Sequence, residues 1–196
     1  MTGTGLVSQG DDAGQPAAGG AVPVARPGRA WRLISVLTLA MAVVAADQGT
    51  KAWALSRLSQ HPAIALPGGW VELRLISNPG AAFSFGSGLT WAFTLCATAA
   101  VAVVPWLATR SRSRIQVAAL GLLLGGAAGN LADRLFRAPG PGTGRVVDFI
   151  DYHQWFIGNV ADIAIVAGVG ILVLRAAAAG RGHRAGAAPP GSAGHP

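Results

Sequence analysis

Four long apolar segments, separated by polar or glycine- and proline-rich stretches, dominate the hydrophobicity pattern of the chain. They cover residues 31–55, 89–108, 115–134 and 159–174. A helix needs about 20 mostly apolar residues to cross a bilayer, and these segments are close to that length. The pattern predicts an all-α membrane protein with four transmembrane helices.

The first apolar segment has a second interpretation. Arginines precede residues 33–46, and Ala45-Ala46 lies where a signal peptidase would cut, so this stretch is similar to a secretory signal peptide. The helical pattern continues past the alanines to Asp47 and Lys51, however, and three more apolar segments follow. These features favour a first transmembrane helix, in which Asp47 and Lys51 share one face at a spacing of four.

The region between the first and second apolar segments has a β pattern. Residues 70–75 alternate between apolar and polar like a half-exposed strand, Asn78-Pro79-Gly80 is a turn signal, and residues 81–86 are predicted as a returning strand. We expect a small extracytoplasmic β-sheet between helices 1 and 2, although an ordinary hairpin explains the same turn. Glycine at position 80 permits a positive φ or the close approach of a ligand to the backbone.

Glycines organise the second half of the chain. Gly121, Gly125 and Gly129 recur every four residues on the third apolar segment, which predicts a smooth face for close helix packing. Residues 136–157 are predicted as a loop, because proline and glycine crowd their first part. Residues 1–29 and 179–196 are rich in glycine, alanine and proline and are predicted as disordered tails that flank one domain, 30–178.

Composition supports a membrane protein. The 196 residues are 52% hydrophobic and only 12% charged, with a mean hydropathy of +0.46. The net charge of +7 does not indicate nucleic-acid binding, because the arginines flank apolar segments. Cys96 is the only cysteine and the four histidines lack an HExxH spacing, so we predict no disulfide, no metal site and no cofactor.

The distribution of arginine predicts the orientation. One side of a four-helix bundle carries Arg26, Arg29, Arg32, Arg110, Arg112, Arg114, Arg175, Arg181 and Arg184. The positive-inside rule therefore places both termini in the cytoplasm. A set of polar residues converges on the opposite, extracytoplasmic side: Asp47, Asn78, Asn130, Asp133, Arg134, Asp148, Asn159 and Asp162.

Two of these residues, Asp148 and Asp162, can form a catalytic pair. One ionised carboxylate can take a proton from water while the other, protonated, polarises an amide carbonyl. Simpler roles remain open: Asn159 and Asp162 can cap a helix, and Asp47 and Lys51 can form an anchoring ion pair. A proton-coupled transporter and a helix-binding scaffold are alternative functions, but transporters place such acids near the bilayer midplane.

Five short motifs, in this order, resemble those of lipoprotein signal peptidase (signal peptidase II). They are Asp47-Gln48-Gly49-Thr50-Lys51, Asn78-Pro79-Gly80-Ala81-Ala82-Phe83, the run from Gly125 to Arg134 (GGAAGNLADR), Val146-Val147-Asp148-Phe149 and Asn159-Val160-Ala161-Asp162. The resemblance implies a four-helix aspartic endopeptidase of the bacterial cytoplasmic membrane. It further implies a monomer that contacts membrane lipids and removes signal peptides from prolipoproteins, cutting before a cysteine that carries diacylglycerol.

The resemblance also implies roles for individual residues. Asp148 and Asp162 would be the catalytic pair, and Asp151, three residues after Asp148, would not belong to it. Other motif residues would line the site, bind the substrate backbone or support the site through ionic contacts: Asn78, Gly80, Asn130, Arg134, Asn159, Asp47, Lys51 and Asp133. The family commonly has phenylalanine where this chain has Gly158.

Overall fold

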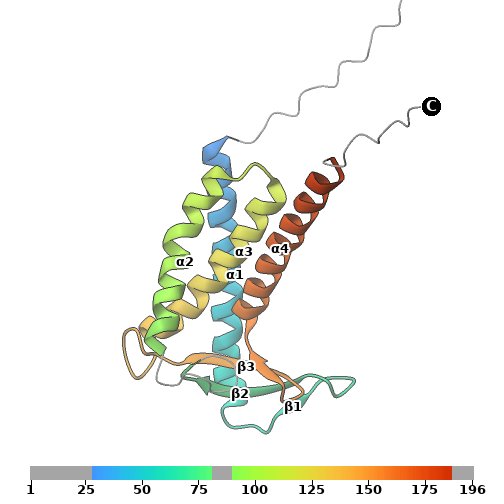
Figure 1. Ribbon diagram of the computed structural model, residues 1–196. Helices are drawn as coiled ribbons and strands as arrows, with labels where there is room; N and C mark the ends of the chain where they lie inside the picture. The colour runs from blue at the N-terminus through green and yellow to red at the C-terminus, as the bar shows by residue number, and fades with distance from the viewer. Residues whose placement is uncertain (1–27, 81–89, 187–196) are drawn as a thin grey trace, which may run out of the picture.

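Four helices and a small sheet make up the described chain. The computed structural model describes residues 28–80 and 90–186. The helices are α1 (Arg29–Leu58), α2 (Thr90–Arg110), α3 (Arg114–Phe136) and α4 (Val160–Gly186). Each contains a stretch that is long and apolar enough to cross a membrane. They form an upright bundle with the sheet at one end, and α1 begins and α4 ends at the opposite end (Figure 1). The predicted fold class is confirmed.

The first and last helices extend beyond the predicted segments. The first apolar segment is part of one continuous helix of 30 residues that packs against α3, so it is integrated into the bundle. α4 continues past residue 174 to Gly186. Most of the two predicted tails, 1–29 and 179–196, lies outside the described residues.

α3 is the central helix and packs against the other three. A Cβ added at Gly121 would lie 2.9 Å from a side-chain carbon of Leu39, and one at Gly125 would lie 2.6 Å from Cβ of Val43. Both contacts are with α1. On the other side, a Cβ at Gly126 would lie 2.4 Å from the carbonyl oxygen of Ala161 in α4. The packing role predicted for Gly121 and Gly125 is confirmed, because only glycine allows such close helix contacts, and Gly126 makes a further contact of this kind.

We expect Gly126→Ala to destabilise the bundle by about 1–3 kcal/mol, since the methyl group would meet rigid backbone of α4. Gly170→Ala in α4 is the matched control, because a Cβ there meets nothing within 4 Å among the described residues. The control should leave stability unchanged or raise it slightly. Thermal unfolding of both variants in detergent measures the difference, and equal midpoints would contradict the prediction.

The sheet is antiparallel and has the order β1-β2-β3-β4. Its strands are β1 (Ile64–Ala65), β2 (Glu72–Asn78), β3 (Val146–Tyr152) and β4 (Phe156–Gly158). The prediction that residues 136–157 form a loop is wrong for the second half of this segment, which supplies β3 and most of β4. A short apolar run does not reveal its partner, and β3 pairs with β2, which is distant in sequence. The predicted strand at 81–86 lies outside the described residues.

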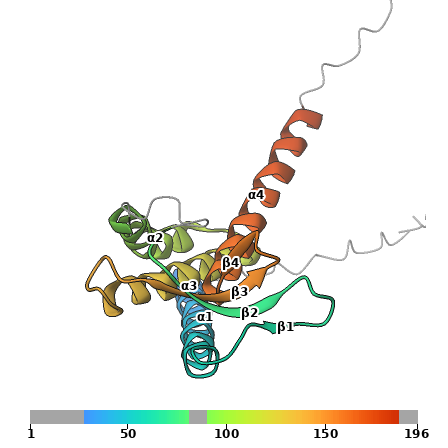
Figure 2. The same ribbon diagram turned by 90° about the horizontal axis from the view of Figure 1, so that it is seen from below.

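Two apolar clusters hold these parts together. The first joins three helices and contains Val36, Ala40, Val104, Ala108, Val117, Leu120 and Leu124. The second packs Phe149 of β3 against Ala54 and Leu58 near the end of α1. Because of this second cluster, the sheet lies across the ends of the helices (Figure 2). The arrangement brings β3 next to the start of α4.

Candidate active site

Asp148 lies on β3 and is almost completely buried, with 2% of its surface exposed. Its Oδ2 accepts a hydrogen bond of 2.8 Å from the side-chain amide of Asn78, the last residue of β2. Its Oδ1 accepts one of 2.6 Å from the side-chain amide of Asn159. Two neutral donors from different elements therefore fix the carboxyl group without a direct ion pair.

Asp162 lies in the first turn of α4. Its Oδ2 accepts a hydrogen bond from the backbone N–H of Asn159, while Asn159 Oδ1 accepts one from the N–H of Asp162. This reciprocal pair is a capping box, which stabilises a helix N-terminus. The other oxygen, Oδ1, accepts a hydrogen bond of 2.8 Å from the side-chain amide of Asn130. The predicted capping role is therefore present, and Asp162 also faces the cavity described below.

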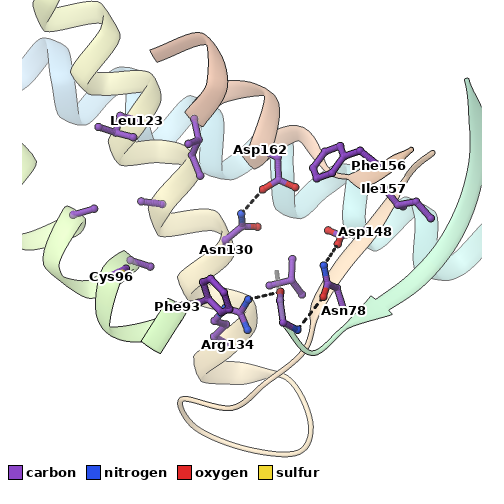
Figure 3. Close-up of a pocket in the computed structure, with 16 residues that line it drawn as sticks. Asn78, Phe93, Cys96, Leu123, Asn130, Arg134, Asp148, Phe156, Ile157 and Asp162 are labelled. Carbon is purple, nitrogen blue, oxygen red and sulfur yellow. Dashed lines mark hydrogen bonds between the residues drawn. The ribbon is translucent and has the colours of Figure 1, made fainter. Parts of the chain in front are cut away.

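Two asparagines connect the carboxylates. The Asn159 amide donates to Asp148 and also to Oδ1 of Asn130. Asn130 in turn donates to Asp162. A chain of side-chain hydrogen bonds thus runs from one carboxylate to the other, and Figure 3 shows both aspartates at the wall of one cavity.

Lys51 orients this network from behind. Its ammonium group is fully buried and lies 2.8 Å from Oδ2 of Asp47 and 2.8 Å from Oδ2 of Asp133. It also donates a hydrogen bond of 3.1 Å to Oδ1 of Asn130. A cation on the amide oxygen forces the amide nitrogen of Asn130 towards Asp162. The ion pair predicted from the i,i+4 spacing exists, but it is buried and has a second carboxylate.

The two carboxylates around Lys51 also tie the elements of the site together. Asp47 Oδ1 accepts a hydrogen bond from the backbone N–H of Ala161 at the start of α4. Asp133 Oδ2 accepts one from the N–H of Val147 on β3. Because Asp148 and Asp162 directly follow these two anchored residues, the cluster around Lys51 sets where both are placed.

A cavity of about 380 Å³ opens in front of the two aspartates. It is lined by Asn78, Gly80, Phe93, Cys96, Ala97, Ala100, Leu123, Ala127, Asn130, Arg134, Val146, Asp148, Phe156, Ile157, Asp162 and Ile165. Most of these side chains are apolar and come from α2, α3 and α4. The polar groups gather at the end of the cavity near the sheet (Figure 3). The lining suits a ligand with apolar groups that places one polar group at the aspartates.

Arg134 and Gly80 form a second wall near the aspartates. Arg134 is buried, its Nη2 donates a hydrogen bond of 3.1 Å to the carbonyl of Gly80, and its guanidinium lies 5.6 Å from the ring centre of Phe93. Its Nη1 is buried without a partner among the described residues. The Gly80 N–H donates to Asn78 Oδ1, which orients the Asn78 amide towards Asp148. Arg134 therefore has a donor free for a ligand.

Asp151 is separate from this site. It is also buried, but it is paired with Arg74 and accepts a hydrogen bond from the backbone N–H of Gln154. Alternate residues of a strand face opposite sides, so Asp148 and Asp151, at an odd spacing, point in opposite directions. Asp151 is not among the residues that line the cavity.

Sequence reasoning missed two residues of the site. Gln48 donates hydrogen bonds to Asp47, to Asp133 and to the carbonyl of Gly129. Its position between the predicted residues Asp47 and Lys51 was the available signal. Phe156 lines the cavity, and a Cβ added at Gly158 would lie 2.6 Å from its ring. The ring of Phe156 therefore fills the space beside Gly158.

Burial raises the pKa of the Asp148 carboxyl from its ordinary value of 3.8 to about 6, and the charge of Asp162 adds to this effect. The hydrogen bonds from Asn78 and Asn159 oppose the rise. The folded protein thus holds a proton on Asp148 over a range of pH in which the unfolded chain has lost it. Ionisation of Asp148 destabilises the fold, because the charged form has been moved out of water.

This shift predicts how stability depends on pH. Between pH 4 and pH 7 the folded state binds more protons at Asp148 than the unfolded state does. The free energy of unfolding therefore falls as pH rises through this range. Above about pH 6 Asp148 is ionised in both states, and the loss of stability is complete. Asp148→Asn removes this dependence. We expect wild type to lose up to about 3 kcal/mol relative to Asp148→Asn across this range. Thermal unfolding in detergent at several pH values tests this, and a constant difference would contradict it.

Among the described residues, no group of three or more His, Cys, Asp and Glu side chains is arranged to hold a metal ion. The chemistry that the site offers is that of its carboxyl groups, its amides and one guanidinium. Two carboxyl groups at one cavity, of which one titrates near neutral pH, can take up and deliver protons in turn.

The sequence is similar to those of known proteins. The sequence model of the family described as Signal peptidase (SPase) II matches residues 39–178. The lipoprotein signal peptidase of Streptomyces griseus is 43% identical over 84% of this chain and 82% of its own length. That of Mycobacterium avium is 43% identical over 80% of this chain and 85% of its own length.

Solved structures show the same fold. A bacterial membrane enzyme determined by the in meso method at 2.3 Å resolution superposes with a TM-score of 0.64 at 23% identity, covering 81% of this chain and 94% of its own. A second such enzyme, at 1.9 Å resolution, gives a TM-score of 0.62 at 25% identity and covers 72% of this chain and 91% of its own. The match to the family model and the identity to these relatives show that the chain belongs to the lipoprotein signal peptidase (signal peptidase II) family.

Proposed function

We propose that this protein is an aspartic endopeptidase that removes signal peptides from diacylglyceryl-modified prolipoproteins, cleaving before the lipidated cysteine. The observation that carries the proposal is the pair Asp148 and Asp162, brought from β3 and α4 to the wall of one largely apolar cavity. Family membership supplies the class of substrate.

The catalytic step follows from the two carboxyl groups. The ionised aspartate removes a proton from a water molecule as the water oxygen attacks the carbonyl carbon of the scissile bond. The other aspartate, protonated, donates a hydrogen bond to the carbonyl oxygen and then transfers its proton to the leaving amine. The raised pKa of Asp148 supports such an exchange, because this carboxyl can keep its proton up to about pH 6.

The remaining site residues position the substrate. The unpartnered Nη1 of Arg134 and the amides of Asn78 and Asn130 surround the place where the scissile bond would lie. The apolar lining from α2, α3 and α4 suits the apolar part of a signal peptide. The acyl chains of the modified cysteine would remain in the surrounding lipid.

The proposal includes the orientation. The ends of the helices that carry the arginine clusters, including Arg29, Arg110 and Arg114, lie opposite the sheet (Figure 1). With these ends in the cytoplasm, as the positive-inside rule requires, the aspartates lie near the extracytoplasmic face of the membrane. The protein would act there as a monomer.

The test is cleavage of a purified prolipoprotein by the purified full-length protein in detergent, with and without diacylglycerol on the substrate cysteine. Mass spectrometry of the products would show a cut directly before that cysteine in the lipidated substrate alone. Cleavage of both substrates, or a cut elsewhere, would contradict the proposed specificity. If the folded protein cleaves neither, the peptidase proposal fails and proton-coupled transport becomes the function to test.

A further inference from the structure

A second cavity lies at the end of the bundle opposite the active site. It has a volume of about 270 Å³ and is formed between the first turns of α1 and α3. Its lining consists of Trp31, Arg32, Ser35, Leu39, Arg114, Val117 and Ala118. None of these residues belongs to the site described above, so the cavity needs an explanation of its own.

Several hydrogen-bond donors at this cavity have no acceptor among the described residues. Arg32 uses its Nη1 to donate a hydrogen bond of 2.7 Å to the carbonyl of Ser111, which fixes its guanidinium. Its Nε is buried and has no partner among the described residues. The half-buried Ser35 and the exposed Arg114 make no side-chain hydrogen bond or ion pair within residues 28–80 and 90–186. A buried donor without an acceptor costs free energy, which a bound acceptor would recover.

The charge of the cavity is also uncompensated. Two arginines line it, and no carboxylate is among the described residues of its lining. Guanidinium groups match the oxygens of a phosphate, to which they can donate two hydrogen bonds at once. Leu39, Val117 and Ala118 give the rest of the lining a mainly apolar surface. A ligand that fits has an anionic phosphate at one end and a hydrocarbon chain at the other.

The position of the cavity identifies where such a ligand comes from. Trp31, half exposed at the start of α1, is placed as aromatic residues are at a membrane interface. Basic pockets between transmembrane helices at this depth suit the headgroups of anionic lipids. We propose that this cavity binds an anionic phospholipid of the leaflet nearest the chain termini, with its phosphate between Arg32 and Arg114 and an acyl chain along α1 and α3.

Variants can separate this site from general attraction between a basic protein and an anionic membrane. Arg114→Gln removes one guanidinium that makes no hydrogen bond or ion pair with a described residue, so the fold should persist. Ala118→Leu fills the cavity without changing charge. The matched control is Arg112→Gln, because Arg112 is exposed, lies two residues from Arg114 and is not part of the lining. The control has the same net charge as Arg114→Gln.

The measurement is native mass spectrometry of the full-length protein in detergent with equimolar phosphatidylglycerol and phosphatidylcholine of identical acyl chains. Wild type should retain one phosphatidylglycerol in preference to phosphatidylcholine. Arg114→Gln should lower this preference at least about fivefold, the factor that corresponds to about 1 kcal/mol per basic side chain. Ala118→Leu should lower retention of the lipid, while Arg112→Gln should behave like wild type.

Two results would overturn the proposal. If Arg114→Gln and Arg112→Gln reduce retention equally and Ala118→Leu has no effect, the preference is general electrostatics and the cavity is not the site. If inorganic phosphate at millimolar concentration displaces the lipid and protects the protein from heat as well as phosphatidylglycerol does, the site recognises free phosphate. Neither result depends on whether the protein cleaves peptides, so the proposed function is tested separately.

Discussion

Asp148→Asn and Asp162→Asn are each expected to lower turnover of a lipidated prolipoprotein by roughly 10²–10⁴-fold or more. An amide cannot take a proton from the attacking water, nor can it donate a carboxylic acid proton to the leaving amine. The loss should be of similar size in both variants, and the double variant should lose little beyond either one, because the two groups act as a unit.

Asp151→Asn is the matched control for these substitutions. Asp151 is as buried as Asp148 and lies on the same strand, but it is paired with Arg74 on the opposite face of the sheet. Its substitution should preserve turnover within a few fold. Circular dichroism and thermal unfolding verify that each variant is folded. If folded Asp162→Asn keeps its activity while wild type cleaves, the protein is a peptidase with a different catalytic pair.

The four helices could be predicted from the sequence because their signal is local. A run of about 20 apolar residues is typical of a transmembrane helix, and each run of this kind in the described chain forms a helix. The extent of the sheet could not be predicted in this way. β3 pairs with β2 across the whole of α2 and α3, and its burial comes from Phe149 packing on α1. No pattern within residues 146–152 reveals such a distant partner.

The candidate site was likewise predictable in part: its residues could be named from the sequence, but their contacts could not. Asp148, Asp162 and their asparagines were found because polar residues at the ends of apolar segments are costly and few. Which atoms they contact was not predictable, since this depends on how β2, β3 and α4 meet. Gln48 was missed although it lies between Asp47 and Lys51, because its position alone does not show which groups its amide contacts. The contact between the ring of Phe156 and Gly158 could be recognised only in the structure.

Lys51 links fold and site, and its removal should have the largest effect on stability. Its ammonium is fully buried between Asp47 and Asp133, so Lys51→Met would leave two buried carboxylates without their shared cation. Breaking a buried ion pair in this way costs about 3–5 kcal/mol. Activity should fall as well, because Asn130 would lose the donor that fixes its amide towards Asp162.

Arg137→Met is the control that separates the effect of burying the cation from the effect of its charge on Asp133. Arg137 contacts the same carboxylate, Asp133, but 28% of its side chain is exposed, so water can replace much of what is lost. Its substitution should cost about 1 kcal/mol or less and leave turnover near wild type. Thermal unfolding and cleavage assays on Lys51→Met and Arg137→Met measure the losses of stability and turnover to be compared. An equal loss in the two would mean that Asp133 merely needs a positive neighbour. A larger loss at Lys51 in both assays would mean that one buried ammonium, by anchoring α4 through Asp47 and β3 through Asp133, holds the two aspartates in place.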